Sequence, residues 1–122
     1  MYKILVCGGR DFSDLKHMFS VLDYIHAKYK ITCVVNGGAP GADSLACAWA
    51  ARNNVAESVH RADWDMHGKR AGPIRNQLML ELHPDIVAVI AFPGGTGTKD
   101  MTDRARAAGF PVFESEKILK LL

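Results

Sequence analysis

Short apolar or β-branched runs alternate along the chain with segments of helical periodicity. The runs predict five strands, at residues 2–7, 31–36, 55–61, 85–92 and 110–114. Residues 86–92 are apolar throughout, which is typical of a parallel strand that is covered on both faces. The chain therefore predicts a sheet with helices packed on both sides.

The segments between these runs predict four helices. The first carries apolar residues at helical spacing from Leu15 to Tyr29, with Ser13 or Asp14 as its N-cap. The second, at 42–53, has a stripe of small residues that permits close approach to a sheet. The third and fourth are expected at about 73–82 and 98–108, and Gly109 ends the fourth. Residues 116–122 form either a short helix or a frayed tail.

Strict alternation of strand and helix predicts an α/β fold, a Rossmann-like three-layer sandwich around a five-stranded parallel sheet. We expect the strand order 3-2-1-4-5. Such sheets bind ligands beyond the carboxyl ends of the strands, where the order reverses between strands 1 and 4. With 122 residues, the chain is expected to form a single domain over 1–122.

The composition narrows the class of ligand. Apolar residues make up 48% and charged residues 23%, which is ordinary for a folded domain, and the formal charge of +2 is weak for binding duplex nucleic acid or an anionic membrane. The charge does not exclude binding of a small anionic ligand. Three isolated cysteines predict buried, reduced thiols and no metal site. No apolar run suits a signal peptide or a membrane helix, so the cytoplasm is the expected compartment.

Ten of the eleven glycines cluster in four segments, each expected to join a strand to a helix. These are Gly8 and Gly9; Gly37, Gly38 and Gly41; Gly68 and Gly72; and Gly94, Gly95 and Gly97. Glycine lets the backbone approach a ligand, and the helix that follows offers unpaired N–H groups, so such loops favour phosphate binding. The alternative is that these glycines only form tight turns.

Common nucleotide motifs are absent. Strand 1 is not followed by G-x-G-x-x-G, and strand 2 ends in Asn36 instead of an acid, which argues against a dinucleotide-dependent dehydrogenase. No segment matches the Walker loop, so energy-coupled hydrolysis of nucleoside triphosphates is disfavoured. Neither a Ser/His/Asp triad nor an H-E-x-x-H helix is evident.

Four glycine-containing motifs together resemble one family. The segment 93–98, P-G-G-T-G-T, is similar to the P-G-G-x-G-T loop of the SLOG superfamily. The segments 8–12, 36–43 and 62–76, with Met79, resemble its YspA (cpYpsA-related) branch, which is related to the LOG phosphoribohydrolases and to DprA/Smf. The likeness covers about residues 2–114. It implies a nucleotide or a nucleotide-derived ligand.

The resemblance leaves catalysis open. LOG enzymes cleave the N-glycosidic bond of nucleoside monophosphates and extend the loop to P-G-G-x-G-T-x-x-E, with an R-K-x-x-M helix. Arg75 and Met79 match that helix, but Asn76 replaces its lysine and Met101 replaces the glutamate. A methionine cannot hold ribose hydroxyls. Asp100 is adjacent, but one position along a helix turns a side chain by about 100°.

The candidate ligand residues follow from loop position and from the resemblance. They are Gly8, Gly9, Arg10, Asn36, Gly37, Gly38, Asp43, Trp64, Arg75, Asn76, Pro93, Gly94, Gly95, Thr96, Gly97 and Thr98. Phosphate would lie on the N–H groups of residues 95–98, with Arg10 and Arg75 as cationic partners.

Several of these residues have a structural alternative. In the alternative interpretation, Arg10 would form a surface ion pair with Asp11 or Asp14. Asp43 would brace its loop or cap a helix. Asn36 would only stabilise the glycine turn by hydrogen bonding, and Trp64 would fill a gap under its loop. The four histidines outside residue 67 are expected to be surface or packing residues.

Two functional classes compete. We expect a sensor or binding domain without a cofactor; the alternative is a nucleotide N-glycosidase or ribosyl transferase with Asp100 and Asp63 as catalytic carboxylates. The irregular segment around Asp63 to Lys69 is a candidate lid, and His67 within it is a weaker acid or base candidate. A DprA-like nucleic-acid role is disfavoured by the low charge. A homodimer is expected by analogy only.

Overall fold

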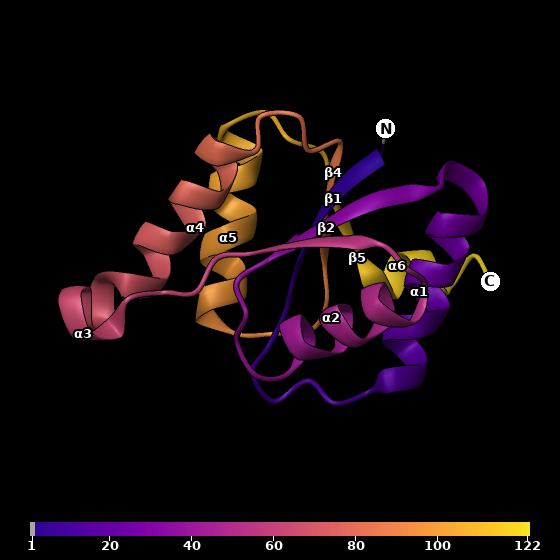
Figure 1. The fold of residues 1–122 in the computed structure, drawn as a ribbon, viewed down its shortest axis with the longest axis horizontal. Helices are drawn as coiled ribbons and strands as arrows, with labels where there is room; N and C mark the ends of the chain where they lie inside the picture. Colours follow the sequence, from indigo (N-terminus) through magenta and orange to yellow (C-terminus); the bar gives the residue numbers. More distant parts are fainter. Residues whose placement is uncertain (1) are drawn as a thin grey trace.

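The computed structural model describes residues 2–122, and strands and helices alternate along them (Figure 1). In chain order the elements are β1 (Tyr2–Cys7), α1 (Leu15–Tyr29), β2 (Ile31–Asn36), α2 (Ala42–Arg52), β3 (Ala56–Val59), α3 (Trp64–His67), the 3₁₀ helix η1 (Gly68–Arg70), α4 (Ala71–Leu82), β4 (Ala88–Ala91), α5 (Thr96–Ala107), β5 (Val112–Glu114) and α6 (Ser115–Leu119).

Within these residues the strands form one five-stranded sheet in the order β3-β2-β1-β4-β5, and every neighbouring pair is parallel. This confirms the predicted Rossmann-like α/β architecture and strand order. The chain leaves β1 toward β2 on one side and returns to β4 on the other. The loops after β1 and β4 therefore diverge at the carboxyl edge of the sheet, which is where such folds bind ligands.

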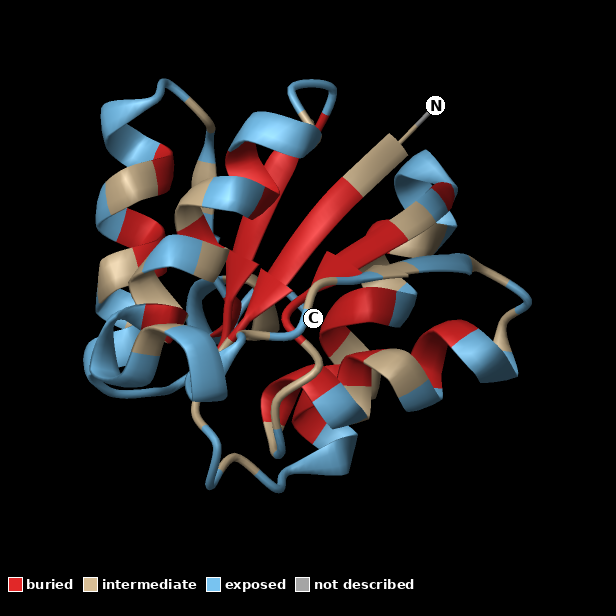
Figure 2. Cartoon of the chain, turned by 60° about the vertical axis from the view of Figure 1, so that its left-hand side comes forward, coloured by how far each residue is buried: buried red, intermediate tan, exposed pale blue. Residues whose placement is uncertain are grey.

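The helices cover both faces of the sheet, and the buried residues lie between the layers (Figure 2). On one face, α1 and α2 pack against apolar residues of β1, β2 and β4, with α6 at the margin. On the other face, α4 and α5 pack through Met79, Leu80, Met101 and Ala105. Continuous apolarity of the central strands is explained by this burial on both sides.

Local sequence signals set where the helices begin. The Asp14 carboxylate accepts a hydrogen bond from the His17 N–H at 3.0 Å and caps α1. Of the two predicted N-caps, Ser13 and Asp14, the structure therefore uses Asp14. Helix α2 starts after Gly41, whose φ of 82° disfavours other residues. Its small residues Ala42, Ala46 and Ala50 are fully buried, so this helix lies close to the sheet.

Several predicted boundaries are corrected. β3, β4 and β5 are shorter than the runs predicted for them, and of these three strands only β4 is buried along its whole length. Helices α4 and α5 begin two residues earlier than predicted, at Ala71 and Thr96. The expected strand-to-helix loop with Gly68 and Gly72 does not form, since Gly68 opens η1 and Gly72 lies inside α4.

The segment from Asp63 to Lys69, which was expected to be irregular, is partly helical. It contains the short helix α3, whose N-cap is Asp63. The C-terminal segment forms the helix α6. Of the three free cysteines, Cys7 is buried, as predicted. Cys33 and Cys47 were also predicted to be buried but are only half-buried. None of the helices in residues 2–122 combines the length and apolarity needed to cross a membrane.

Candidate functional site

A cavity of about 240 Å³ lies at the carboxyl ends of β1 and β2, between α4 and the start of α5. It is lined by Val6, Cys7, Gly8, Gly9, Arg10, Gly37, Ala39, Asp43, Arg75, Asn76, Met79, Gly95, Thr96, Gly97, Thr98 and Met101. We call it the first cavity. Segments that are far apart in sequence converge here, as expected for the switch point of a parallel sheet.

Gly9 links three of the loops around the first cavity. Its N–H donates to the Pro93 carbonyl at 2.9 Å, and its own carbonyl accepts from the Ala42 N–H at 3.1 Å. Gly8 lies so close to its neighbours that an added Cβ would be 2.5 Å from the Cβ of Ala42 and 2.9 Å from that of Phe92. Both glycines therefore serve tight packing of the loops in addition to lining the cavity.

Asp43 braces the β2–α2 loop from inside. Its Oδ2 accepts hydrogen bonds from the N–H groups of Gly37 at 3.2 Å and Ala39 at 3.1 Å. Burial raises the pKa of this carboxyl, against the opposing effects of the loop N–H groups and Arg75. Asp43 thus combines the bracing role with a position on the cavity wall.

Asn36 is enclosed by the protein, with 0% of its surface exposed. Its Oδ1 accepts from the Gly38 N–H at 2.8 Å, and its Nδ2 donates to the Cys47 Sγ at 3.3 Å. It is absent from the lining of the first cavity. The position favours the turn-tying alternative over the predicted ligand contact, because both polar groups of the side chain already have partners.

Arg75 ties α4 to the β2–α2 loop. Its Nη1 donates to the Gly37 carbonyl at 2.8 Å, and its Nε donates to the Asn76 Oδ1 at 3.1 Å. Burial and the nearby Arg10 lower the pKa of Arg75, while Asp43 acts in the opposite direction. The guanidinium is held at the cavity wall with donor groups to spare, as its five N–H bonds allow.

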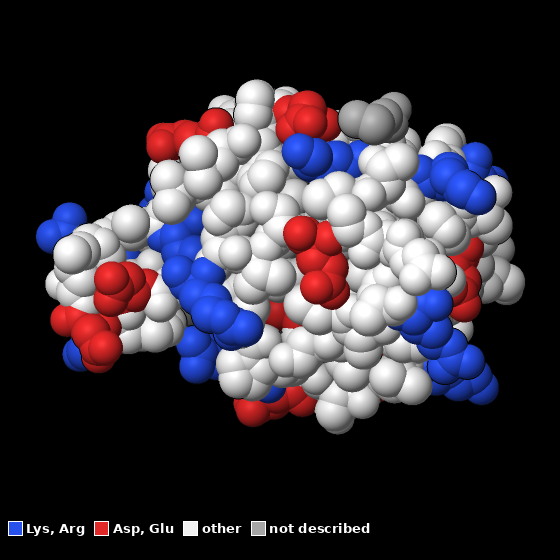
Figure 3. Space-filling model, viewed as in Figure 1, with Lys and Arg blue, Asp and Glu red and all other residues white. Residues whose placement is uncertain are grey.

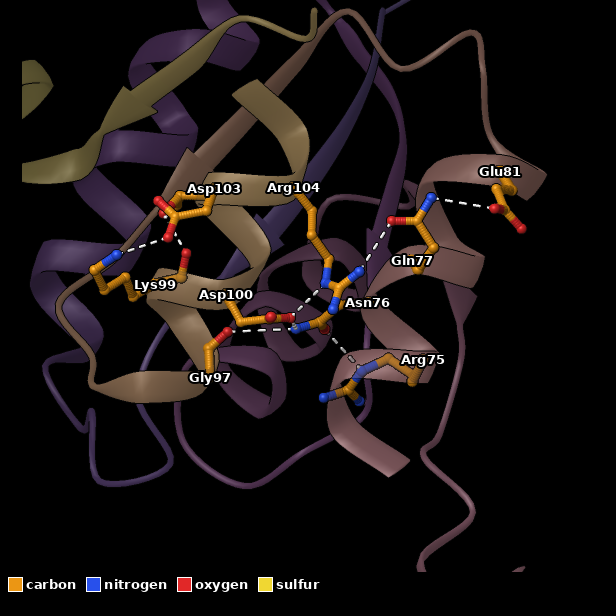
Figure 4. Close-up of polar contacts among 10 residues, drawn as sticks. Arg75, Asn76, Gln77, Glu81, Gly97, Lys99, Asp100, Asp103 and Arg104 are labelled. Carbon is orange, nitrogen blue, oxygen red and sulfur yellow. Dashed lines mark hydrogen bonds and ion pairs between the residues drawn. The ribbon is translucent and has the colours of Figure 1, made fainter. Parts of the chain in front are cut away.

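The predicted catalytic carboxylates have other partners. Figure 4 shows Asp100 between α5 and α4, where its Oδ2 accepts from the Asn76 Nδ2 at 3.0 Å and the Arg104 Nε at 2.9 Å. Burial acts to raise the pKa of Asp100, but these two hydrogen bonds prevail and lower it. Asp63 caps α3 by accepting from the Met66 N–H at 3.0 Å. Neither lines the first cavity.

Asp100 and Asp63, the carboxylates named for the enzyme alternative, therefore do not border the first cavity. Met101, at the position of the LOG glutamate, lines the cavity together with residues of the first turn of α5, and only 1% of its surface is exposed. An i, i+4 pair of Asp100 with Arg104 is visible in the sequence and signals an ion pair along the helix. The pattern Asp63-x-x-Met66 before a short helix is likewise compatible with a cap.

The floor of the first cavity is apolar and was missed by reasoning from the loops. Val6 and Cys7 close β1, Met79 comes from α4, and Ala39 follows Gly38. Burial, and secondarily Asp43, raises the pKa of Cys7 to about 12. Cys7 is therefore a protonated thiol at neutral pH and does not act as a nucleophile. In the sequence, Met79 stands out only as the match to the methionine of the R-K-x-x-M helix, and the glycine loops give no signal for Val6 and Cys7.

The first turn of α5 forms the wall opposite Arg75. The N–H groups at the start of a helix have no partner within the helix, and its dipole favours an anion there. Added Cβ atoms at Gly95 and Gly97 would meet no atom within 4 Å. Pro93 and Gly94, which were predicted to bind ligand, do not line the first cavity; they border a separate one with Glu114 and Glu116.

A second cavity of about 230 Å³ adjoins the first and shares Arg10, Gly37, Ala39 and Arg75 with it. Its other lining residues are Gly38, Pro40, Arg61, Ala62 and Trp64. Trp64 is 48% exposed, and the guanidinium carbon of Arg10 lies 5.3 Å from the centre of its ring. In the described part of the chain Arg10 forms no ion pair with Asp11 or Asp14, the alternative considered for it.

A metal site finds no support in the described residues, which contain no group of three or more His, Cys, Asp or Glu side chains placed to share an ion.

Comparisons with known proteins place this chain. The model of the YspA, cpYpsA-related SLOG family matches residues 2–67. The Gene 61 protein of Mycobacterium phage D29 is 39% identical over 121 residues, which cover 93% of this chain and 95% of that protein.

A solved structure of MurG from Acinetobacter baumannii superposes with a TM-score of 0.61 at 12% identity, over 93% of this chain and 34% of the MurG chain. This likeness concerns the fold, and the chain spans about a third of the MurG length. The family match and the phage relative together show that the chain belongs to the YspA, cpYpsA-related SLOG family.

Proposed function

We propose that this protein binds a nucleotide or a nucleotide-derived molecule in the first cavity and acts as a sensing or binding domain. The observation that carries the proposal is the convergence of three glycine loops, the start of α5 and Arg75 on one cavity at the switch point of the sheet. The SLOG family and the Rossmann-like fold are consistent with a ligand of this kind.

The chemistry of the walls fits a phosphate group. The first turn of α5 supplies N–H donors, and Arg10 and Arg75 supply guanidinium groups from the opposite side. At about 240 Å³ the first cavity is smaller than the 300 Å³ or more of common ligand sites. The ligand would therefore extend beyond the first cavity, past Arg10 and Arg75.

A hydrolase is the weaker candidate. Asp100 and Asp63 are engaged outside the first cavity, and Met101 offers no charge to an oxocarbenium-like transition state. Asp43 is the one carboxylate among the lining residues, and its Oδ2 is committed to two backbone N–H groups.

Native mass spectrometry would test the proposal. The purified protein would be incubated with nucleoside monophosphates, ADP-ribose and NAD, and both retained ligand and released free base would be measured. We expect a retained nucleotide and no free base. Release of base would establish the hydrolase instead, and no retention of any compound would contradict the proposed function.

A further inference from the structure

The two adjoining cavities differ in charge. The first is lined by Arg10 and Arg75 together with the carboxylate of Asp43. The second is lined by Arg10, Arg75 and Arg61, and its lining residues include no carboxylate. The second cavity is therefore the more strongly positive of the two, although it lies farther from the start of α5.

The three guanidinium groups around the second cavity lack acidic partners. The ion pairs found within residues 2–122 join other side chains. Arg61 donates from Nη1 to the Gly38 carbonyl at 2.8 Å, just as Arg75 donates to the Gly37 carbonyl. Each bond fixes a guanidinium against the loop, and each group keeps further N–H donors for a ligand.

Fixing like charges around one cavity is unfavourable without an anion between them. Figure 3 shows Lys and Arg side chains gathered along the hollow between the α3–α4 arm and the body of the molecule. Asp43 lies near Arg10 and Arg75 and offsets part of this charge, but within residues 2–122 none of the three arginines forms an ion pair with a carboxylate. The cluster is thus arranged for an anionic group that comes from outside the protein.

We propose that the second cavity binds a second phosphate group of the ligand, so that the protein selects nucleotides with two phosphate groups over nucleoside monophosphates. The inference rests on the proposed function, since the first phosphate is assigned to the first cavity. Arg10 and Arg75 line both cavities and would lie between the two anionic groups. Arg61 lines only the second cavity and is the residue that reads the second phosphate.

Two arrangements share this chemistry, and they are separable. In a nucleoside 5′-diphosphate the phosphates are adjacent, whereas in a nucleoside 3′,5′-bisphosphate the ribose separates them. Isothermal titration calorimetry would compare each with the matching 5′-monophosphate, for purine and pyrimidine bases. We expect one of the two to bind at least about tenfold more tightly than the monophosphate, as an added charge-assisted contact allows.

Three variants test the role of Arg61. Arg61→Gln should reduce the preference for the second phosphate to about one and change monophosphate affinity less than about twofold. Arg61→Lys keeps the charge and should retain part of the preference. Arg52→Gln is the matched control, because Arg52 is an exposed arginine at the end of α2, remote from these loops, and it should behave as the unaltered protein.

The outcomes separate this inference from the proposed function. The second-phosphate site would be overturned if compounds with one and two phosphates bound with equal affinity, or if the preference survived Arg61→Gln. In either case, binding of the monophosphate would still support the first cavity. A protein that binds none of the compounds would contradict the proposed function itself, and the inference with it.

Discussion

Gly97 sits in the first turn of α5, where an added Cβ would meet open space on the wall of the first cavity. Gly97→Ala should stabilise the protein by about 0.5 to 1 kcal/mol, because glycine costs more conformational entropy than alanine in a helix. The same methyl group should lower ligand affinity by occupying space at the phosphate position. Chemical denaturation and calorimetry would measure the two effects.

Gly72 provides the control for that substitution. It also lies in the first turn of a helix, α4, and an added Cβ would be in ordinary contact, 3.5 Å from the Trp64 ring. It lines neither cavity. Gly72→Ala should therefore stabilise the protein to a similar extent and leave affinity unchanged. Equal affinity losses in both variants would remove Gly97 from the site.

Asp100 shows how a single residue connects two elements. Asp100→Asn should destabilise the protein by about 1 kcal/mol, since it weakens a charge-assisted bond to Arg104 and disturbs the contact with Asn76. Because Asp100 lies outside the first cavity, ligand affinity should change less than about twofold. Denaturation and calorimetry test both statements, and a large loss of affinity at unchanged stability would return Asp100 to the site.

At the scale of elements, a histidine pair joins the end of β3 to the end of α4. The Nε2 atoms of His60 and His83 lie 2.8 Å apart, so only one of them can carry a hydrogen between the rings. Burial, then Lys3 and His60, lowers the pKa of His83 below its usual 6.5. The folded protein therefore favours neutral His83.

This pair predicts a loss of stability in mild acid. A lowered folded pKa means that the stabilising contribution is fully present above about pH 6.5 and is lost as the pH falls through the folded value. The free energy of unfolding should decrease between pH 7.5 and 5.5, and His83→Gln should flatten this dependence. His67→Gln, at a histidine in α3 with no side-chain hydrogen bond in the structure, is the control. An unchanged slope in His83→Gln would contradict the assignment.

The elements themselves were largely predictable, and the side-chain placements within the site were less so. Buried strands are apolar on both faces, so their order of appearance and the helices between them follow from the pattern alone. Arg75, which lines the first cavity, could be selected from the sequence because it matches the arginine of the R-K-x-x-M helix. The side-chain partners of Asp100 were harder to predict, because a shift of one position on α5 turns a side chain by about 100°.

The second cavity could not be predicted from the chain. It forms only because the segment after β3 returns to lie beside the loops after β1 and β2, which brings Arg61 near Arg10 and Arg75. These residues are separated by up to 65 positions in sequence. Nothing in the local pattern around Arg61 marks it as part of a charged cluster.

At the scale of the whole molecule, ligand binding and folding are linked. A ligand that binds only the folded state at 100 times its dissociation constant adds about 2.7 kcal/mol to stability. For a chain of this size, the unfolding temperature should rise by on the order of 10 °C. Thermal unfolding with and without the nucleotide would show it, and Gly97→Ala should reduce the shift while Gly72→Ala should not.

The two tryptophans lie in opposite environments, and this gives the protein a built-in optical probe. Trp49 has 0% of its surface exposed and donates from Nε1 to Asp23 at 2.8 Å, whereas Trp64 is 48% exposed beside Arg10 at the second cavity. Emission from Trp49 should stay constant as a reference, while Trp64 responds to anything that displaces Arg10. Binding at this edge of the sheet can then be followed by fluorescence without any label.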